Sequence, residues 1–421
     1  MFGLVDCNNF YASCQRVFEP HLRDKSVVIL SNNDGCVIAR SNEAKALGIK
    51  MGAPAFEYEE LFRKNHVYIY SSNFALYGDM SSRVMNTLAM FTPLMEVYSI
   101  DEAFLKFEGF DFYNLKEYGE KIQKIVTKGT GIPISVGIAS TKTLAKVANK
   151  IAKKYPIQTR SSYVIDSEQK RIKALKWTDV GDIWGIGARY TLKLRNIGVS
   201  NAYQFSQLSD DWVKKELSII GLRIKYELMG NSMLDLEKIQ HKKAIATTRS
   251  FEKIYTKYED LSERVSAFTA YSSEKLRKQN SHSNLVMVFI RTNYFRKDQP
   301  QYSRNIVIKT DYATGSYIEL NRCAQIGLKK IYKPGYHYKK AGVILMGITP
   351  DSSTQLSLFE SPNPKHRILM RAMDQLNQSI GSTKVMFAGQ SLDRKWKMKQ
   401  EKLSPYFTTK IKDIIKIKLR E

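Results

Sequence analysis

The amino-acid sequence predicts a multidomain α+β protein, and three observations support this fold class. The chain has 421 residues, which is longer than a typical compact domain. Its first third alternates apolar runs of strand type with stretches of helical period, a mixture typical of α/β or α+β domains. Residues 166–240 have a mostly helical pattern, and a second mixed region follows them.

Local signals define the elements of the first third. Strands are predicted in MFGLVDCNNF, MEVYSI, AFLKFEG and IPISVGIAS. VVILSNNDGCVIAR is predicted to form two strands, because NNDG is strong turn chemistry between apolar runs. Helical period marks FYASCQRVF, residues 74–91 and KEYGEKIQKIVTKGTG, and a short helix in SNEAKALGIK ends at Gly48.

The second mixed region has its own strands and helices. Strands are predicted in SFEKIY, NLVMVFIRTNYF, RNIVIKTD and KAGVILMGI, and helices in LSERVSAFTAYSSEKLRKQ and LNRCAQIGLKKIYK. After Pro350 the chain becomes irregular in DSSTQLSLFESPNPKHR, and a helix and a basic tail follow.

The charge balance indicates a polyanionic partner. Lys and Arg number 66 against 41 Asp and Glu, which gives a net charge of +25. No apolar run approaches the roughly 18–20 residues of a membrane span, and MFGLVDCNNF lacks the features of a secretory signal. We therefore expect a cytoplasmic nucleic-acid protein without a membrane partner. Four cysteines without CxxC spacing fit a reducing compartment.

The segment TKTLAKVANKIAKK (141–154) predicts an amphipathic helix with a row of lysines. Its apolar residues recur at helical spacing on one face. The opposite side carries Lys142, Lys146, Lys150 and Lys153. The pattern fits either a solvated lysine face or a row of cations that faces phosphates.

Three carboxylates lie at predicted strand ends among apolar residues. Asp101 and Glu102 stand between MEVYSI and AFLKFEG, so they occupy a turn if these runs form a hairpin. There both can lean to one side, unlike successive residues of a regular strand. Asp6 ends the first strand. The three acids predict a site for two divalent cations, since two metals about 4 Å apart can hold both oxygens of a phosphoryl displacement. An acidic turn that exposes its charges is the alternative.

The stretch IWGIG (183–187), followed by ARYTLKLRNIGV, matches a helix–hairpin–helix signature. Its glycines let backbone N–H groups approach a phosphate, and the next helix presents its positive end. Such a contact holds a duplex without reading its sequence. Gly185, Gly187, Arg189 and Lys193 are the predicted DNA contacts, and a plain loop between core helices is the alternative.

Short segments along the chain match the motifs of one known protein family, and they occur in the same order as in that family. The matched segments are DCNNFYASC, LSNNDGCVIAR, EAKALGIKMG, SSNFALYGDMSSRVM, YSIDEAF, GIASTKTLAKVANKIAKK, DIWGIG, SFEKI, YKKAGVIL, QLSLF and FAGQ. With them, essentially the whole chain resembles the Y-family translesion DNA polymerases, most closely the UmuC-type subunits of bacterial DNA polymerase V.

The resemblance implies a right-hand fold with a family-specific little finger. The expected parts are a palm (1–25 and 77–165), fingers (26–76), a helical thumb with the helix–hairpin–helix (166–240), an α/β little finger (243–350) and a C-terminal tail with a clamp-binding peptide (351–421). It also implies error-prone, template-directed synthesis in the SOS response to DNA damage, with two Mg²⁺ ions. One ion would activate the primer 3′-hydroxyl and the other would bind the triphosphate.

The same resemblance assigns roles to residues of the first third. Asp6, Asp101 and Glu102 are the expected catalytic and metal-binding carboxylates, and the Cys7 carbonyl is a further ligand. Phe10 and Tyr11 match the nucleotide site, with Tyr11 as a steric gate against a 2′-hydroxyl.

Two lysines match basic residues that hold the triphosphate. They are Lys45 in the fingers and Lys153 on the lysine helix. Many family members carry a tyrosine three residues before the fingers' basic residue, where this chain has Asn42. UmuC-type sequences also lack it, so a tyrosine contact to phosphate is not expected. Lys45 also offers a point charge rather than the fork of an arginine.

The later segments imply partners. Gln355, Leu356, Leu358 and Phe359 resemble a sliding-clamp peptide whose apolar side chains fill a pocket. Arg249 and basic strands such as RNIVIKT are expected to grip the DNA primer–template, with dNTPs as the other substrate. A processed UmuD-type dimer, a RecA filament and a location at the nucleoid are implied as well.

Two other functions fit part of the pattern. A non-catalytic DNA-binding accessory subunit would use the hairpin and the net charge alone, but three uncompensated carboxylates would weaken its hold on phosphates. A palm-like nucleotidyl cyclase would also use two metals, yet it needs no helix–hairpin–helix, little finger or clamp peptide.

Overall fold

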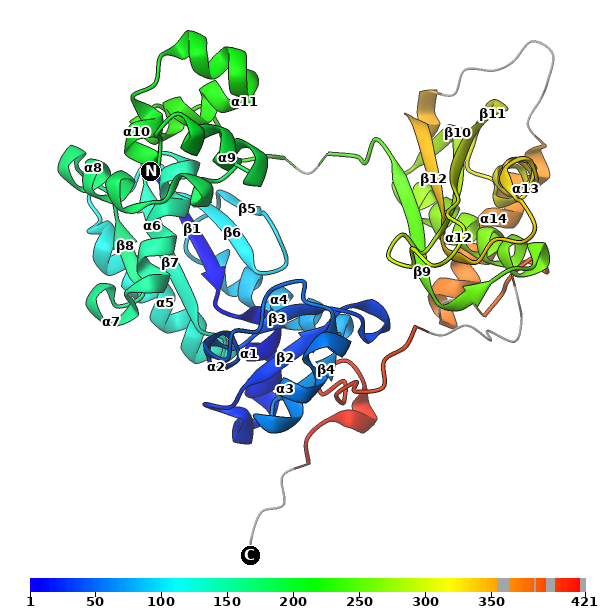
Figure 1. Cartoon of the computed structure of the whole chain (residues 1–421), viewed down its shortest axis with the longest axis horizontal. Coiled ribbons are helices and arrows are strands. Elements are labelled where there is room, and N and C mark those ends of the chain that lie inside the picture. The colour runs from blue at the N-terminus through cyan, green and yellow to red at the C-terminus, as the bar shows by residue number, and fades with distance from the viewer. Residues whose placement is uncertain (239, 354–362, 382–383, 391–397, 417–421) are drawn as a thin grey trace, which may run out of the picture. The chain divides into compact units, whose positions relative to one another are not determined.

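The computed structural model describes the whole chain except residues 239, 354–362, 382–383, 391–397 and 417–421. It divides into two compact units (Figure 1). One unit joins Met1–Lys238 to the C-terminal Gln400–Glu421, and the other is Ile239–Lys399. The predicted clamp peptide, with Gln355, Leu356, Leu358 and Phe359, lies outside the described residues.

A five-stranded sheet in the order β5-β6-β1-β7-β8 forms the centre of the first unit. Its strands are β1 Phe2–Cys7, β5 Met95–Val97, β6 Glu102–Lys106, β7 Ile134–Ala139 and β8 Ser162–Val164. β1 pairs antiparallel with both β6 and β7, so it lies in the middle of the sheet. MEVYSI and AFLKFEG form the predicted hairpin, with β5 antiparallel to β6.

Helices cover both faces of this sheet. Three helices bury side chains in one apolar core, called the first core: α1 Phe10–Phe18, α4 Phe74–Leu88 and α5 Leu115–Thr130. The helix α6 Lys142–Lys154 contributes to a separate apolar core, called the second core, and the short α7 Pro156–Thr159 follows it. Side chains of β1 alternate between the cores: Val5 and Cys7 lie in the first, Phe2 and Leu4 in the second.

The residues between α1 and α4 form a smaller sheet. Its order is β3-β2-β4, with β2 Val27–Leu30 antiparallel to β3 Val37–Arg40 and parallel to β4 Tyr68–Ser71. The predicted strand–turn–strand unit is therefore present in β2 and β3. The helices α2 Asn42–Ala46 and α3 Glu59–Lys64 complete this part, with its own apolar core.

The region after β8 is helical, as its pattern predicts. Its helices are α8 Glu168–Trp177, α9 Ala188–Asn196, α10 Ala202–Ser206 and α11 Asp210–Met229. Their apolar side chains share the second core with α6.

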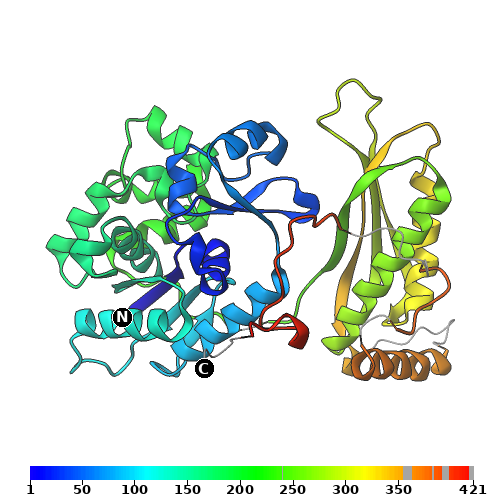
Figure 2. The same cartoon turned by 90° about the horizontal axis from the view of Figure 1, so that it is seen from below.

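The second unit is a four-stranded antiparallel sheet in the order β11-β10-β12-β9. Its strands are β9 Ile245–Tyr255, β10 Ser281–Thr292, β11 Ser303–Thr314 and β12 Tyr338–Pro350. Two helices, α12 Tyr258–Lys278 and α13 Tyr317–Ile331, pack on one face of it (Figure 2). A third helix, α14 Pro364–Ser379, is joined to α12 by an ion pair of Arg277 with Asp374 at 2.6 Å.

The five predicted domain boundaries stay a prediction, because the structure separates two units only. Within the described residues, no helix is both long and apolar enough to cross a membrane.

Candidate active site

Strand pairing places Asp6 and Glu102 side by side. The two residues are direct partners in the β1–β6 register. Residues at even positions of both strands, such as Leu4 and Phe104, point into the second core, on the side of α6. Asp6 and Glu102 have the same parity, so both carboxylates leave the sheet toward α6. Two like charges directly opposite each other destabilise a sheet unless positive groups compensate them.

Asp101 is held in the bend that joins β5 to β6. The Ser99 hydroxyl donates to Oδ1 of Asp101 at 2.6 Å, and the backbone N–H groups of Asp101 and Glu102 donate to Ser99 Oγ. The N–H of Cys7 donates to the Asp101 carbonyl at 2.9 Å. These bonds tie the bend to the end of β1, and they bring the three predicted carboxylates to one end of the two strands.

Lysines of α6 compensate two of these carboxylates. Nζ of Lys153 lies 2.6 Å from Oδ1 of Asp6, and Nζ of Lys146 lies 3.0 Å from Oε1 of Glu102. α6 can lie this close to β7 because Gly137 has no side chain. A Cβ there would overlap backbone atoms of α6 at Ala145 and Asn149.

The predicted row of four lysines needs a correction. Lys142 is only 2% exposed and forms an ion pair with the buried Glu96 at 2.7 Å, so it faces neither solvent nor phosphate. Lys150 instead pairs with Asp182, in the turn that leads to α9. The periodic pattern shows which helix face carries lysines. It does not show that one of them, Lys142, forms an ion pair with a buried glutamate.

The electrostatics of Asp6 reflect this crowding. Burial raises the pKa of Asp6, Lys153 lowers it, and the charges of Glu102 and Asp101 raise it further. Among the described residues, no group of three or more His, Cys, Asp and Glu side chains is arranged to hold a metal as it stands. The donor set nevertheless fits Mg²⁺, because carboxylates and a carbonyl are hard oxygen ligands. The two ammonium groups supply positive charge where a bound cation would supply it.

Tyr11 stands beside the carboxylates in a stack of rings. It stacks on the buried Tyr77 with centroids 4.3 Å apart and meets the edge of Phe74. Burial raises the pKa of Tyr11, and the charge of Asp101 raises it further. Phe10 is 4% exposed and belongs to the core, with its ring centroid 5.7 Å from that of Tyr11. Tyr11 is thus the half-buried ring of the pair.

Lys45 is fixed by two asparagines. Its Nζ donates to Oδ1 of Asn9 at 2.5 Å and to Oδ1 of Asn42 at 3.5 Å, and Asn9 also donates to Asn42. Asn42, the departure from the common tyrosine, therefore orients Lys45. Desolvation lowers the pKa of Lys45, and the positive charges of Lys153 and Arg40 lower it further. The ammonium groups of Lys45 and Lys153 are therefore close enough for the charge of one to affect the other.

The two glycines of the predicted helix–hairpin–helix differ in backbone conformation and position. Gly185 adopts φ +91°, which L side chains rarely adopt, whereas Gly187 is the N-cap of α9 with open space around it. Arg189 is exposed in the first turn of α9, and Lys193 pairs with Glu216. The N-terminal amides of α9 therefore face an open surface.

An aromatic cluster that the sequence reasoning missed joins this loop to the acidic hairpin. Nε1 of Trp184 donates to the hydroxyl of Tyr98 at 3.2 Å. The ammonium of Lys146 lies over both rings, 4.5 Å from the centroid of Tyr98 and 5.2 Å from that of Trp184. The aromatic neighbours within YSIDEAF and IWGIG were the available signal.

In the second unit, Arg249 is exposed on β9, the edge strand of the sheet, where its guanidinium donates to the carbonyl of Thr248. The position leaves the side chain on the surface, as a DNA contact requires.

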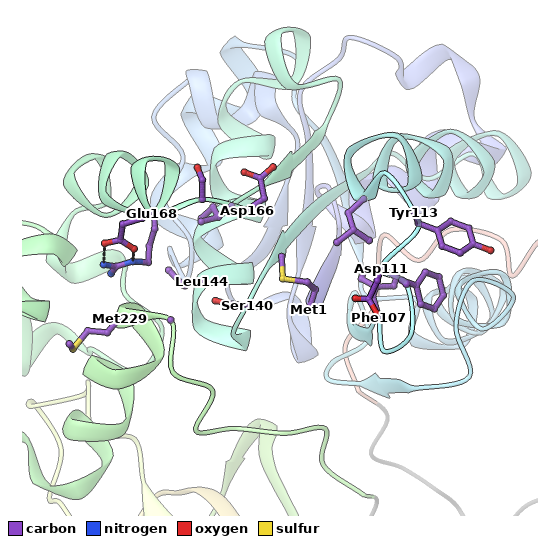
Figure 3. A pocket seen from close by; sticks show the side chains of 15 residues that line it. Met1, Phe107, Asp111, Tyr113, Ser140, Leu144, Asp166, Glu168 and Met229 are labelled. Carbon is purple, nitrogen blue, oxygen red and sulfur yellow. Dashed lines mark hydrogen bonds and ion pairs between the residues drawn. The ribbon is translucent and has the colours of Figure 1, made fainter.

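A pocket of about 460 Å³ opens elsewhere in the first unit (Figure 3). It is lined by Met1, by residues after β6 such as Phe107 and Asp111, and by Glu168 and Arg171 of α8. Met1 precedes β1, whereas Asp6 lies near its other end, so the pocket is separate from the carboxylates.

Solved structures share this fold. A chimera of the Y-family DNA polymerases Dbh and Dpo4 matches with a TM-score of 0.68 and 20% identity, over 83% of this chain and 100% of that chain. The insertion ternary complex of Dbh DNA polymerase matches with a TM-score of 0.55 and 21% identity, over 83% and 100%. The fold is that of a Y-family DNA polymerase, and the chain as a whole is mixed α/β.

Comparisons of sequence identify the family within this class of polymerases. Residues 5–150 match the impB/mucB/samB family, 242–358 its C-terminal domain, and 367–417 a domain of unknown function, DUF4113. Protein UmuC of Salmonella typhimurium is 39% identical over 99% of this chain and all of its own length. Protein ImpB of Salmonella typhimurium is 40% identical over 98% of this chain and 99% of its own. DNA polymerase IV 1 of Bacillus subtilis is 25% identical over 93% and 92%.

The chain belongs to the impB/mucB/samB family of UmuC-type Y-family polymerases. It is a DNA-directed DNA polymerase of error-prone translesion synthesis. Dependence on a divalent metal is general in the Y family.

Proposed function

We propose that Asp6, Asp101 and Glu102, with the Cys7 carbonyl, hold two Mg²⁺ ions at which a nucleotide is added to a primer. The observation that carries this is the direct cross-strand pairing of Asp6 with Glu102, with an ammonium group on each carboxylate. The bound ions would supply charge that activates the 3′-hydroxyl and neutralises the triphosphate.

The chain's own residues position the nucleotide. Lys45 and Lys153 bind the triphosphate as point charges, and the Asn9–Asn42 pair holds Lys45 in place. Tyr11 supports the sugar from below, and its ring stacked on Tyr77 is a rigid wall against a 2′-hydroxyl. Phe10 anchors Tyr11 from the core.

DNA is held by its backbone. Gly187 and the first amides of α9 bind a phosphate, Gly185 shapes the turn, and Arg189 and Lys193 add charge. Arg249 grips the template from the second unit. Contacts to phosphates carry no sequence information, which suits damaged templates.

Primer extension past an abasic site tests the carboxylates. With Mg²⁺, we expect the wild type to extend and Asp101→Ala/Glu102→Ala to fall by roughly 100-fold or more, while both bind primer–template equally. Glu59→Ala/Glu60→Ala removes two adjacent exposed acids of α3 and is the matched control. Equal extension by Asp101→Ala/Glu102→Ala and the wild type would show that the assignment is wrong.

We further infer a cytoplasmic place at the nucleoid and three protein partners: a sliding clamp, a processed UmuD-type dimer and a RecA filament. Deleting residues 355–359 should abolish clamp pull-down, whereas deleting 417–421, of the same length, should not. Clamp binding that survives the first deletion would refute the peptide.

A further inference from the structure

The C-terminal segment 400–407 returns to the first unit and lies along the edge of the small sheet (Figure 1). The N–H of Ser71 in β4 donates to the Lys402 carbonyl at 2.9 Å, and the Lys402 N–H donates to Ser71 Oγ at 3.0 Å. Nε2 of Gln400 donates to the Ser72 carbonyl at 2.9 Å. The segment therefore covers an edge strand that would otherwise present unpaired backbone groups.

Ser404 is the buried centre of this contact. It is 5% exposed, and its Oγ accepts from Nε2 of Gln15 and from Nδ2 of Asn73, each at 3.1 Å. Nδ2 of Asn73 also donates to the Pro405 carbonyl at 3.1 Å. Three residues further on, Phe407 stacks on Phe18 of α1 with centroids 4.8 Å apart. A serine of the C-terminal segment thus joins α1 to the start of α4.

Both hydrogen bonds that the Ser404 hydroxyl accepts come from residues that support the ring partners of Tyr11. Nε2 of Gln15, on the buried face of α1, also donates to the hydroxyl of Tyr77 at 3.0 Å, and Tyr77 stacks on Tyr11. Asn73 is the N-cap of α4, the helix that carries Tyr77 and Phe74, which are both ring partners of Tyr11. The Ser404 hydroxyl therefore fixes the amide and the helix against which the gate ring rests.

We infer that Ser404 is a positioning residue for nucleotide selection, and that residues 400–407 are an integral part of the sugar-selecting wall. The inference rests on the proposed role of Tyr11 as the gate. It gives a function to a stretch inside the region matched by the domain of unknown function. Without the hydroxyl, a buried N–H of Gln15 loses its acceptor, so the amide, Tyr77 and the start of α4 relax together.

The test is the ratio of kcat/KM for a dNTP to that for the matching rNTP, measured on the full-length chain with its accessory dimer and filament. We expect Ser404→Ala to lower this ratio about fivefold or more, since small displacements near a reacting centre have large effects. Ser404→Thr keeps the hydroxyl and should restore most of the ratio. Thr409→Ala removes an exposed hydroxyl that bonds to the Tyr406 carbonyl, and it should leave the ratio unchanged.

The ratio is independent of the fraction of active enzyme, so partial unfolding does not imitate the effect. A wild-type ratio in Ser404→Ala overturns the inference, and so does an equal fall in Thr409→Ala. If Tyr11→Ala lowers the ratio while Ser404→Ala does not, the gate stands and the positioning role fails. If Tyr11→Ala has no effect, both fail. In the Tyr11→Ala background, Ser404→Ala should add nothing, and an additive loss would contradict action through Tyr11.

Discussion

The ammonium group of Lys153 lies 2.6 Å from Oδ1 of Asp6, although the two residues are 147 positions apart in the sequence. Asp6 lies at the end of β1, and Lys153 lies in the last turn of α6, which packs on the same face of the sheet. The pair joins the proposed metal ligands to the proposed triphosphate site, so charge at one affects the other.

Replacing Lys153 with methionine should weaken nucleotide binding. Lys153→Met keeps most of the length of the side chain but removes its charge, so we expect KM for dNTPs to rise roughly tenfold, the value of one charge-assisted hydrogen bond. Lys150→Met is the matched control, because Lys150 lies on the same helix and pairs with Asp182 instead. Steady-state incorporation kinetics measure both, and equal KM values for the two variants would contradict this role.

Removing the ring of Tyr11 should relax sugar selection. Tyr11→Ala opens the space in front of Tyr77, so we expect ribonucleotide incorporation to rise by roughly 100-fold relative to deoxynucleotide incorporation. Tyr11→Phe retains the wall and should behave like the wild type. Single-nucleotide insertion with rNTPs measures the difference. Unchanged sugar selection in Tyr11→Ala would show that Tyr11 is not the steric gate.

Lys45 should make nucleotide binding sensitive to alkaline pH. Its pKa is lowered, so as pH rises the ammonium loses its proton earlier than an ordinary lysine. Positive charge at the triphosphate is then lost, and KM for dNTPs rises at alkaline pH. In Lys45→Arg the charge persists, so that rise should disappear. The control is Lys50→Arg at an exposed site, and a pH profile shared by all three proteins would show that Lys45 is not the titrating group.

Gly137 should be intolerant of any side chain. A methyl group in Gly137→Ala would overlap the backbone of α6, so we expect the free energy of unfolding to fall by about 2–3 kcal/mol. Gly129→Ala is the matched control: Gly129 lies in α5 with open space around it, and alanine there should add about 0.5–1 kcal/mol. Urea unfolding measures both. Equal stability of the two variants would mean that α6 is free to shift away from β7.

Much of the local structure could be predicted from the sequence. FYASCQRVF is the helix Phe10–Phe18, and the NNDG turn separates Val27–Leu30 from Val37–Arg40. The apolar period of 141–154 correctly marks the buried face of α6. These features depend on period, turn chemistry and helix signals within a few residues, which is why one sequence suffices for them.

The partners of those elements could not be predicted in this way. Nothing in the spacing of the lysines distinguishes Lys142, which is buried against Glu96, from Lys153, which faces Asp6. The sequence predicts only a C-terminal tail for residues 351–421, yet Ser404 and Phe407 in that range pack against α1. The aromatic pair Tyr406-Phe407 in a basic segment was the only local signal.

The sequence by itself determined the elements, which follow from residue types and short periods. Its resemblance to the Y family implied the class of this protein and the acids, lysines and aromatic ring proposed for its site. The tertiary structure alone decided which lysine neutralises which carboxylate, and that Ser404 reaches the ring stack of Tyr11. The physical reason is that ion pairs and buried hydrogen bonds depend on strand register and helix packing, which join residues far apart in the chain.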